Sequence, residues 1–116
     1  MTSGSGVNTY LYAATNESTP GSGNFDIVNK FAHGTDKIDL SAIVGLNTNN
    51  QSVAVNILTS TPATIAAHTI DLVQSGGNTE VYANASGSIE NLPSNADMEI
   101  HLVGVSLTPT DLILHH

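Results

Sequence analysis

The sequence predicts an all-β domain, an antiparallel β-sandwich of five or six strands with at most one short helical segment. In most segments apolar residues alternate with polar ones, which is the pattern of half-buried strands. Clusters of Gly, Pro, Asn and Ser separate these segments, as turns do. Charged residues make up only 10% of the 116-residue chain. Its polarity comes mostly from Ser, Thr, Asn and Gly, and this composition favours strands and turns over surface helices.

The first part of the chain predicts a strand between two irregular segments. Residues 1–6 are rich in Gly and Ser and should be flexible. A strand is predicted over residues 7–14, with Tyr10 and Tyr12 on one face and smaller residues on the other. Residues 15–24 carry one proline and two glycines and are predicted to form a loop.

The stretch from Phe25 to Ile43 has the most regular pattern in the chain. Its sequence is FDIVNKFAHGTDKIDLSAI, and it predicts two half-buried strands joined by a tight turn at residues 33–36. It contains Asp26, Asp36 and Asp39, three of the ten acidic residues. We expect Asp36 to close the turn through a bond to the backbone, and Asp39 either to cap the next residues or to face solvent.

The middle and last parts of the chain predict a hairpin, two further strands and a final apolar segment. Paired glycines between two alternating runs predict a hairpin over residues 68–84, because such a turn needs positive φ. The other elements are a loop at 44–52, a strand at 53–58, a short turn or helical segment at 61–67, a loop at 85–95, a strand at 96–105, a turn at 108–110 and a last segment at 111–114. His115 and His116 are interpreted as the start of an appended affinity tag.

Charge and composition exclude several classes of partner. Two lysines against ten acidic residues give a net charge of −8, so a basic patch for nucleic acid or anionic lipid is excluded and cations are the natural ligands. No apolar run of about 18 residues predicts membrane insertion. The chain has no cysteine, so no disulfide contributes to its stability.

Four landmarks in the sequence occur in the same order as in a known family. They are the D-x-I-x-x-F-x-x-G-x-D-K-I-D-L-S pattern within residues 25–43, a Gly-Gly hairpin at 75–78, the segment ADMEIHLVG at 96–104, and Asp111-Leu112-Ile113-Leu114. Residues 7–114 thus resemble, as a single domain, the C-terminal domain of serralysin-type metalloproteases and other bacterial RTX proteins. Two features depart from the family: the calcium-binding nonapeptide repeats of a β-roll are missing, and Leu112 stands where Phe is commoner.

The resemblance implies a function in export and folding. It implies the non-catalytic C-terminal module of a secreted bacterial protein, extracellular or on the cell surface, that caps the calcium-bound β-roll of the upstream domains. Asp111, Leu112, Ile113 and Leu114 would form the secretion signal read by a type I ABC transporter complex. The alternative is a carbohydrate-binding or adhesive module, as in alginate epimerases. With three tyrosines and no tryptophan to stack on sugar rings, a glycan is the second choice of partner.

The resemblance also implies where calcium would bind. It maps the acidic ligands of a terminal calcium onto Glu17 and Asp26, and the alternative is that both are solvated loop carboxylates. Calcium prefers six to eight oxygen ligands, which an acidic chain rich in Asn can supply. A weaker site is expected at residues 84–88, where Asn and Ser replace the acids of related proteins. Asp97 would be its remaining acidic ligand.

No pattern in the sequence predicts catalysis. His33, His68 and His101 are far apart and lack the spacing that would place two of them on one helix face for zinc. No G-x-S-x-G motif is present. Asp97 and Glu99 share a strand face, yet glycosidase chemistry needs a cleft that a small sandwich rarely provides. We therefore expect a non-enzymatic domain, and the activity of the parent protein would lie elsewhere.

Overall fold

The computed structural model describes residues 7–21, 23–49, 51–92 and 94–115. The flexible segment predicted at residues 1–6, and His116 of the predicted tag, lie outside the described residues. The strands are β1 (Thr9–Leu11), β2 (Asp26–Asn29), β3 (Lys37–Asp39), β4 (Ala54–Leu58), β5 (Thr64–Ile65), β6 (Thr69–Ser75), β7 (Asn78–Asn84), β8 (Glu90–Asn91), β9 (Met98–Val103) and β10 (Leu112–Ile113). The helical elements are the 3-10 turns η1 (Thr15–Glu17), η2 (Val44–Leu46) and η3 (Pro109–Asp111).

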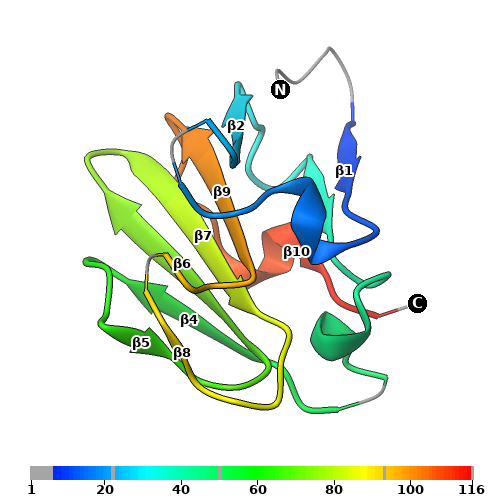
Figure 1. The fold of residues 1–116 in the computed structure, drawn as a ribbon. Helices are drawn as coiled ribbons and strands as arrows, with labels where there is room; N and C mark the ends of the chain where they lie inside the picture. Colours follow the sequence, from blue (N-terminus) through cyan, green and yellow to red (C-terminus); the bar gives the residue numbers. More distant parts are fainter. Residues whose placement is uncertain (1–6, 22, 50, 93, 116) are drawn as a thin grey trace.

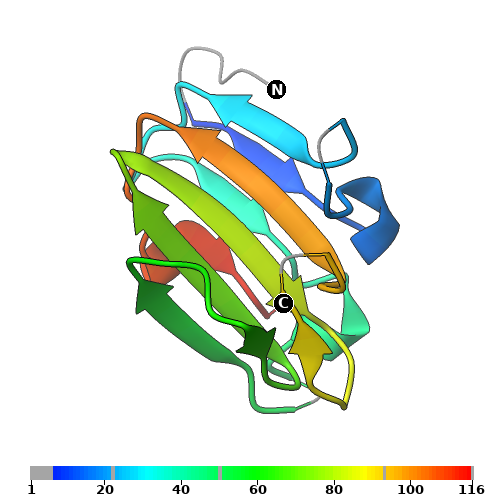
Figure 2. The same ribbon diagram turned by 60° about the vertical axis from the view of Figure 1, so that its left-hand side comes forward.

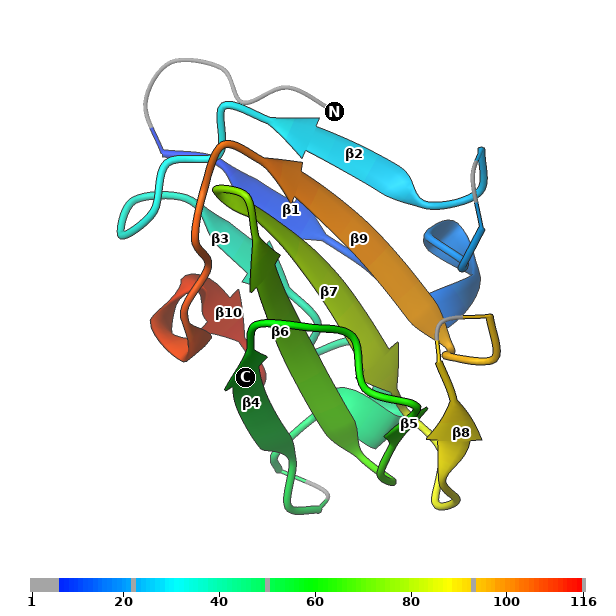
Figure 3. The same ribbon diagram turned by 90° about the vertical axis from the view of Figure 1, so that its left-hand side faces the viewer.

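Two sheets pack face to face, which confirms the predicted all-β sandwich (Figure 1). A five-stranded sheet has the order β2-β9-β7-β6-β4, and a three-stranded sheet has the order β1-β3-β10. Figure 3 looks onto the five-stranded sheet, with β1, β3 and β10 behind it. In Figure 2 the strands of the larger sheet run obliquely across the molecule, with β2 and β4 at its opposite edges.

The pairing of the strands is mixed rather than antiparallel throughout. The β6–β7–β9 meander and the β5–β8 pair are antiparallel, as expected. The pairs β1–β3, β3–β10, β2–β9 and β4–β6 are parallel. Each parallel pair joins segments that are separated by a long connection, and alternation of apolar residues carries no information about strand direction. The sequence pattern therefore predicted the strands but not how they pair.

The core lies between the two sheets. The buried face of β9 carries Met98, Ile100 and Leu102, which are at most 1% exposed, as the alternation predicts. Opposite them, the three-stranded sheet contributes Tyr10 and Ile38. A second, smaller cluster lies on the outer face of the larger sheet, where β5 and β8 cover it; it consists of Ile65, Val73, Tyr82 and Ala96.

The hairpin predicted around the paired glycines is confirmed. Ser75 pairs with Asn78, so Gly76 and Gly77 alone form the turn, with φ values of 60° and 81°. A turn with positive φ at both central positions matches the right-handed twist of the two strands. This hairpin fixes the register of β6 and β7, and thereby which of their side chains face outward.

Several segments differ from the prediction. Residues 61–67 form no helix and instead contain the short strand β5. Ile65 of this strand is buried in the outer cluster, against the larger sheet. The loops expected at 15–24 and 44–52 contain the turns η1 and η2. β2 and β3 flank the predicted turn but belong to different sheets, so the chain crosses between layers at this point.

Candidate functional site

Glu17 and Asp26, the predicted calcium ligands, lie on consecutive elements at one edge of the sandwich. Glu17 ends η1, and its Oε1 accepts hydrogen bonds from the backbone N–H groups of Ala13 and Ala14, the latter at 3.1 Å. Asp26 begins β2, and its Oδ2 accepts a hydrogen bond of 2.8 Å from the Tyr12 hydroxyl. Each carboxylate therefore has a structural contact of its own.

The side chain of Tyr12 connects these two carboxylates electrostatically. Burial raises the pKa of the Tyr12 hydroxyl above its usual range, and the hydrogen bond and charge of Asp26 raise it further. The charge of Glu17 acts in the same direction. Both carboxylates therefore lie near enough to Tyr12 for their charges to act on its hydroxyl group.

Asp97, the weaker predicted ligand, lies beside a second acidic residue that the sequence analysis missed. Its Oδ2 accepts a hydrogen bond of 2.9 Å from the backbone N–H of Ala85. Glu90 of β8 lies beside the Asp97 carboxylate, and burial, hydrogen bonding between these two side chains and the charge of Asp97 raise the pKa of Glu90 to about 7. Among the described residues, Glu90 Oε1 has no hydrogen-bond partner although it is buried. The pair has the features of a cation site: two close carboxylates and an unsatisfied oxygen.

The neutral loop at residues 84–88 is occupied by its own hydrogen bonds. The Asn84 amide is fully buried and donates to the carbonyl oxygens of Ile65, Ala66 and Ser88. Its Oδ1 accepts hydrogen bonds from the N–H and the hydroxyl of Ser86. The Asn84 side chain therefore holds the loop in shape, and the carboxylate oxygens available beside it come from Glu90 and Asp97.

The predicted secretion signal is part of the folded domain. Asp111 is fully buried, and its carboxylate accepts hydrogen bonds from the backbone of Gly34 at 2.9 Å and of Thr108 at 3.0 Å. His33 Nδ1 lies 2.6 Å from the same carboxylate. Burial alone would raise the pKa of Asp111, but the hydrogen bonds from Thr108, Gly34 and His33 outweigh it, and the pKa lies below its usual value. Leu112 and Ile113 then form β10 beside β3.

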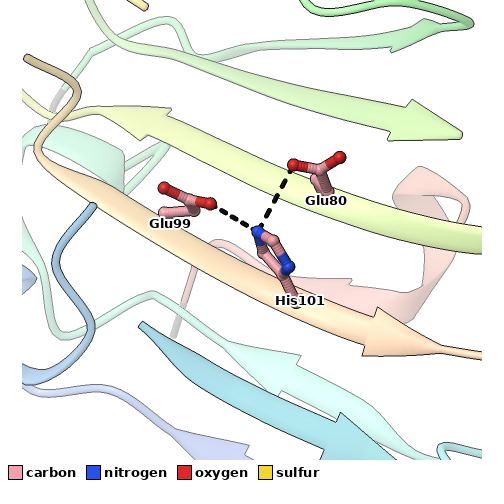
Figure 4. Close-up of side chains that lie close together, drawn as sticks. All are labelled: Glu80, Glu99 and His101. Carbon is pink, nitrogen blue, oxygen red and sulfur yellow. Dashed lines mark hydrogen bonds and ion pairs between the residues drawn. The ribbon is translucent and has the colours of Figure 1, made fainter. Parts of the chain in front are cut away.

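A histidine and two glutamates form a further cluster on the outer face of the five-stranded sheet (Figure 4). Glu99 and His101 lie two residues apart on β9, and Glu80 lies opposite His101 on β7. His101 Nε2 is hydrogen-bonded to Glu99 Oε2 and lies 3.3 Å from Glu80 Oε2. One atom from each of the three side chains lies within 4.8 Å of the other two.

Neighbouring residues hold this cluster in position. The Phe25 ring stacks on the His101 ring, with centroids 3.7 Å apart. Tyr82 donates a hydrogen bond of 2.8 Å to Glu80 Oε2, and burial, this bond and the nearby glutamates raise the pKa of Tyr82. Glu80 and His101 also line a pocket of about 280 Å³. The cluster is therefore ordered and opens into a pocket.

The sequence alone predicted part of this cluster of Glu80, Glu99 and His101. Residues 97, 99 and 101 alternate on one strand face, so an acid beside a histidine was visible. Glu80 joins them only through the antiparallel register of β7 and β9. That register links segments about twenty residues apart, and no local pattern specifies it.

Other polar residues have structural roles. Asp36 is buried and closes the predicted turn by accepting a hydrogen bond of 2.9 Å from the backbone of Ala32. Asp39 accepts hydrogen bonds from both the N–H and the hydroxyl of Ser41, and so caps that residue. His68 Nδ1 lies 2.9 Å from the carbonyl oxygen of Gly45.

Comparison with known families agrees with this fold and with the order of its landmarks. A family model described as peptidase M10 serralysin C terminal matches residues 2–114. The chain belongs to this family. No curated protein matches it.

Membership in the serralysin C-terminal family confirms the resemblance seen in the sequence. The match spans all four landmarks, from the central stretch at residues 25–43 to the segment at 111–114, and ends before His115. It indicates a domain of a secreted protein. Among the described residues, no helix is long and apolar enough to cross a membrane.

Proposed function

We propose that this chain is a non-catalytic C-terminal module of a secreted bacterial RTX-type protein, which caps a calcium-bound β-roll and carries the type I secretion signal. The observation that carries this function is the match of the serralysin C-terminal family over residues 2–114. The partners would be the upstream domains of the parent protein and the type I ABC transporter complex. The location would be extracellular or the bacterial cell surface.

The polar contacts support a non-catalytic domain. His33 bonds to Asp111, and His68 to a backbone carbonyl, so both rings are used in holding loops. His101 bonds to Glu99 rather than to a nucleophile. Nucleophilic catalysis requires a base within hydrogen-bond reach of the nucleophile. None of these three contacts supplies that arrangement.

The burial of Asp111 supports export of an unfolded chain. In the folded domain Asp111 and Leu112 are at most 9% exposed, and backbone bonds hold the segment against β3. A transporter that reads residues 111–114 as an address must therefore meet them before the domain folds. Calcium outside the cell would then favour folding after transport, because a ligand that binds only the native state stabilises it.

Two pairs of carboxylates fit calcium. Calcium takes oxygen ligands at about 2.3–2.6 Å and accepts carboxylates and backbone carbonyls together. Glu90 and Asp97 fit best, because Glu90 Oε1 is buried without a partner among the described residues. Glu17 and Asp26 would form a second site, at the edge where β2 begins. A calcium ion at the first pair would replace the proton that Glu90 otherwise shares with Asp97.

The glycan-binding alternative is less well supported by the structure. Sugar rings are usually bound by exposed aromatic faces. Tyr10, Tyr12 and Tyr82 are only 8%, 1% and 3% exposed, so none offers such a face.

A secretion assay tests the function directly. The chain ending at Leu114, fused behind a passenger protein in a cell with a type I system, should direct the passenger into the medium. Deleting residues 106–114 should abolish secretion, because the transporter would lose its address. Secretion that is unchanged by the deletion would falsify the signal assignment.

A matched variant separates loss of the signal from loss of the fold. Val28→Asp places a charge at a fully buried position of β2 and should prevent folding while leaving residues 106–114 intact. We expect this variant to be secreted as well as the native sequence. If it stays in the cell, the transporter requires more of the domain than its last segment.

A further inference from the structure

We propose that Glu80, Glu99 and His101 form a binding site for a divalent transition-metal ion of the zinc class, on the outer face of the five-stranded sheet. Zinc binding here requires neither the carboxylate pairs proposed for calcium nor the secretion signal. The three side chains come from two adjacent antiparallel strands, β7 and β9, and point toward one another (Figure 4).

The distances between the ligand atoms suit a small ion. Two ligand atoms bound at about 2.0–2.1 Å to a tetrahedral zinc ion lie ~3.3 Å apart. His101 Nε2 lies 3.3 Å from Glu80 Oε2, and all three ligand atoms lie within 4.8 Å of one another. Glu99 needs only a small outward shift to share an ion with the other two.

The types of ligand select against calcium. Calcium binds oxygen atoms almost exclusively, whereas zinc readily takes one imidazole nitrogen together with carboxylate oxygens. Zinc sites with three protein ligands keep the fourth position for water or another ligand. Here the fourth position would face the pocket of about 280 Å³ that Glu80 and His101 line together with Ser75, Asn78 and Thr79.

The charges around the cluster favour a cation. The chain has only two lysines and no other strongly basic residue, and the Lys37 ammonium group donates to the carbonyl oxygen of Thr110. In the part of the chain that the structure describes, Glu80 and Glu99 form ion pairs only with His101. Glu99 is 5% exposed, so its charge is little screened by water.

Each ligand also has an outer contact, as metal ligands in proteins usually do. The stacked Phe25 ring fixes the plane of the His101 ring. Tyr82 donates to Glu80, and the backbone N–H of Gly21 donates to Glu99 Oε1 at 3.3 Å. The three ligands are thus held near their binding positions before an ion arrives, which lowers the entropic cost of binding.

Calorimetric titration of zinc into the full chain tests this site. The chain should carry His115→Ala and His116→Ala, so that terminal imidazoles do not bind the metal. We expect one zinc ion per chain. Because a ligand is lost, His101→Gln should weaken this binding by at least ~100-fold, and Tyr82→Phe, which removes only an outer contact, by about 10- to 100-fold. Cobalt(II) in place of zinc should give the visible absorption of a four-coordinate ion.

Matched variants keep the result interpretable. His33→Gln removes an imidazole elsewhere and should leave zinc affinity unchanged, as should Glu90→Gln at the pair proposed for calcium. Glu80→Gln, at a more exposed ligand, provides a second ligand variant if His101→Gln does not fold. The proposed site is refuted if both ligand variants still bind zinc. It is also refuted if the chain with only His115→Ala and His116→Ala binds no zinc. Zinc displaced by an equal concentration of calcium would overturn the assigned metal class.

Discussion

The Glu90 carboxyl group couples the folding of this domain to pH, and at the proposed calcium site it would also couple folding to calcium. It lies against the Asp97 carboxylate, and burial together with this neighbour raises its pKa from 4.5 to about 7. Two adjacent carboxylates cannot both ionise without a cost in free energy. At neutral pH the pair can relieve that cost either by keeping a proton or by binding a cation.

Glu90→Gln should change how the stability of the domain depends on pH. Between pH 4.5 and pH 7 the folded chain keeps a proton on Glu90 that the unfolded chain loses. The stabilisation from this proton is complete below pH 4.5 and is lost as the pH rises toward 7. A neutral glutamine avoids the loss, so the variant should exceed the native sequence in stability by about 1–2 kcal/mol at pH 8 and by little at pH 4.5. Thermal unfolding at both pH values measures this.

The effect of calcium on thermal unfolding tests the proposed calcium sites with the same variant. Millimolar calcium at pH 8 should raise the melting temperature of the native sequence, by an amount equivalent to ~2.7 kcal/mol at a hundredfold excess over Kd. Glu90→Gln should lose most of this rise, and Glu80→Gln should keep it. Asp26→Asn tests in the same way whether the Glu17–Asp26 pair contributes to the rise. A calcium response that is equal in all variants would refute both calcium sites. A stability difference that is the same at pH 4.5 and pH 8 would refute the raised pKa.

At the scale of elements, the turn η2 is held against the loop that follows β7. A Cβ atom placed on Gly45 would lie 1.8 Å from the carbonyl oxygen of Ala85, so only glycine allows this contact. The Gly45 carbonyl also contacts His68. The turn η2, which follows β3, therefore packs against the loop after β7 and the residue just before β6.

Gly45→Ala should destabilise the domain by ~3 kcal/mol, at the upper end of the usual cost of overpacking, because backbone atoms must move. Gly104→Ala is the control: this glycine has φ of 76° with open space around its Cβ position. It should cost ~1–2 kcal/mol, which is the price of the left-handed conformation alone. Denaturant unfolding compares the two variants. A smaller loss for Gly45→Ala than for Gly104→Ala would contradict the contact with Ala85.

The elements differ in how well the sequence predicted them. The hairpin β6–β7 was predictable because its turn and register are local, set by Gly76 and Gly77. The buried face of β9 was predictable from the alternation of Met98, Ile100 and Leu102. β5 was not, because two residues carry no periodicity and their strand exists only through pairing with β8.

At the scale of the whole molecule, each of the two packed sheets pairs a strand from the first part of the chain with a strand from the last part. β2 pairs with β9, and β3 lies between β1 and β10. Such long-range pairing explains why the site residues were only partly predictable. Asp97 and Glu17 were predicted from the family resemblance, and their calcium binding stays a prediction, whereas the positions of Glu90 and the His101 cluster depend on pairings that no local pattern encodes.

A chain ending at residue 97 should therefore fail to fold. It lacks β9, which joins β2 to β7, and β10, which completes the smaller sheet. We expect no cooperative thermal transition and a disordered far-ultraviolet circular dichroism spectrum. The chain ending at residue 114 should melt cooperatively with a spectrum dominated by β structure. A cooperative transition in the shorter chain would show that the remaining strands form a domain without β9.

The position of β9 between β2 and β7 also sets when the domain can fold in a living cell. A ribosome synthesises β2 early and β9 late, so β2 has no partner strand while the intervening seventy or so residues emerge. Long-range pairing is slow even in a complete chain, because the entropy of loop closure is lost before the stabilising contacts form. Synthesis and folding of the larger sheet are thereby separated in time, because β2 stays unpaired until β9 has been made.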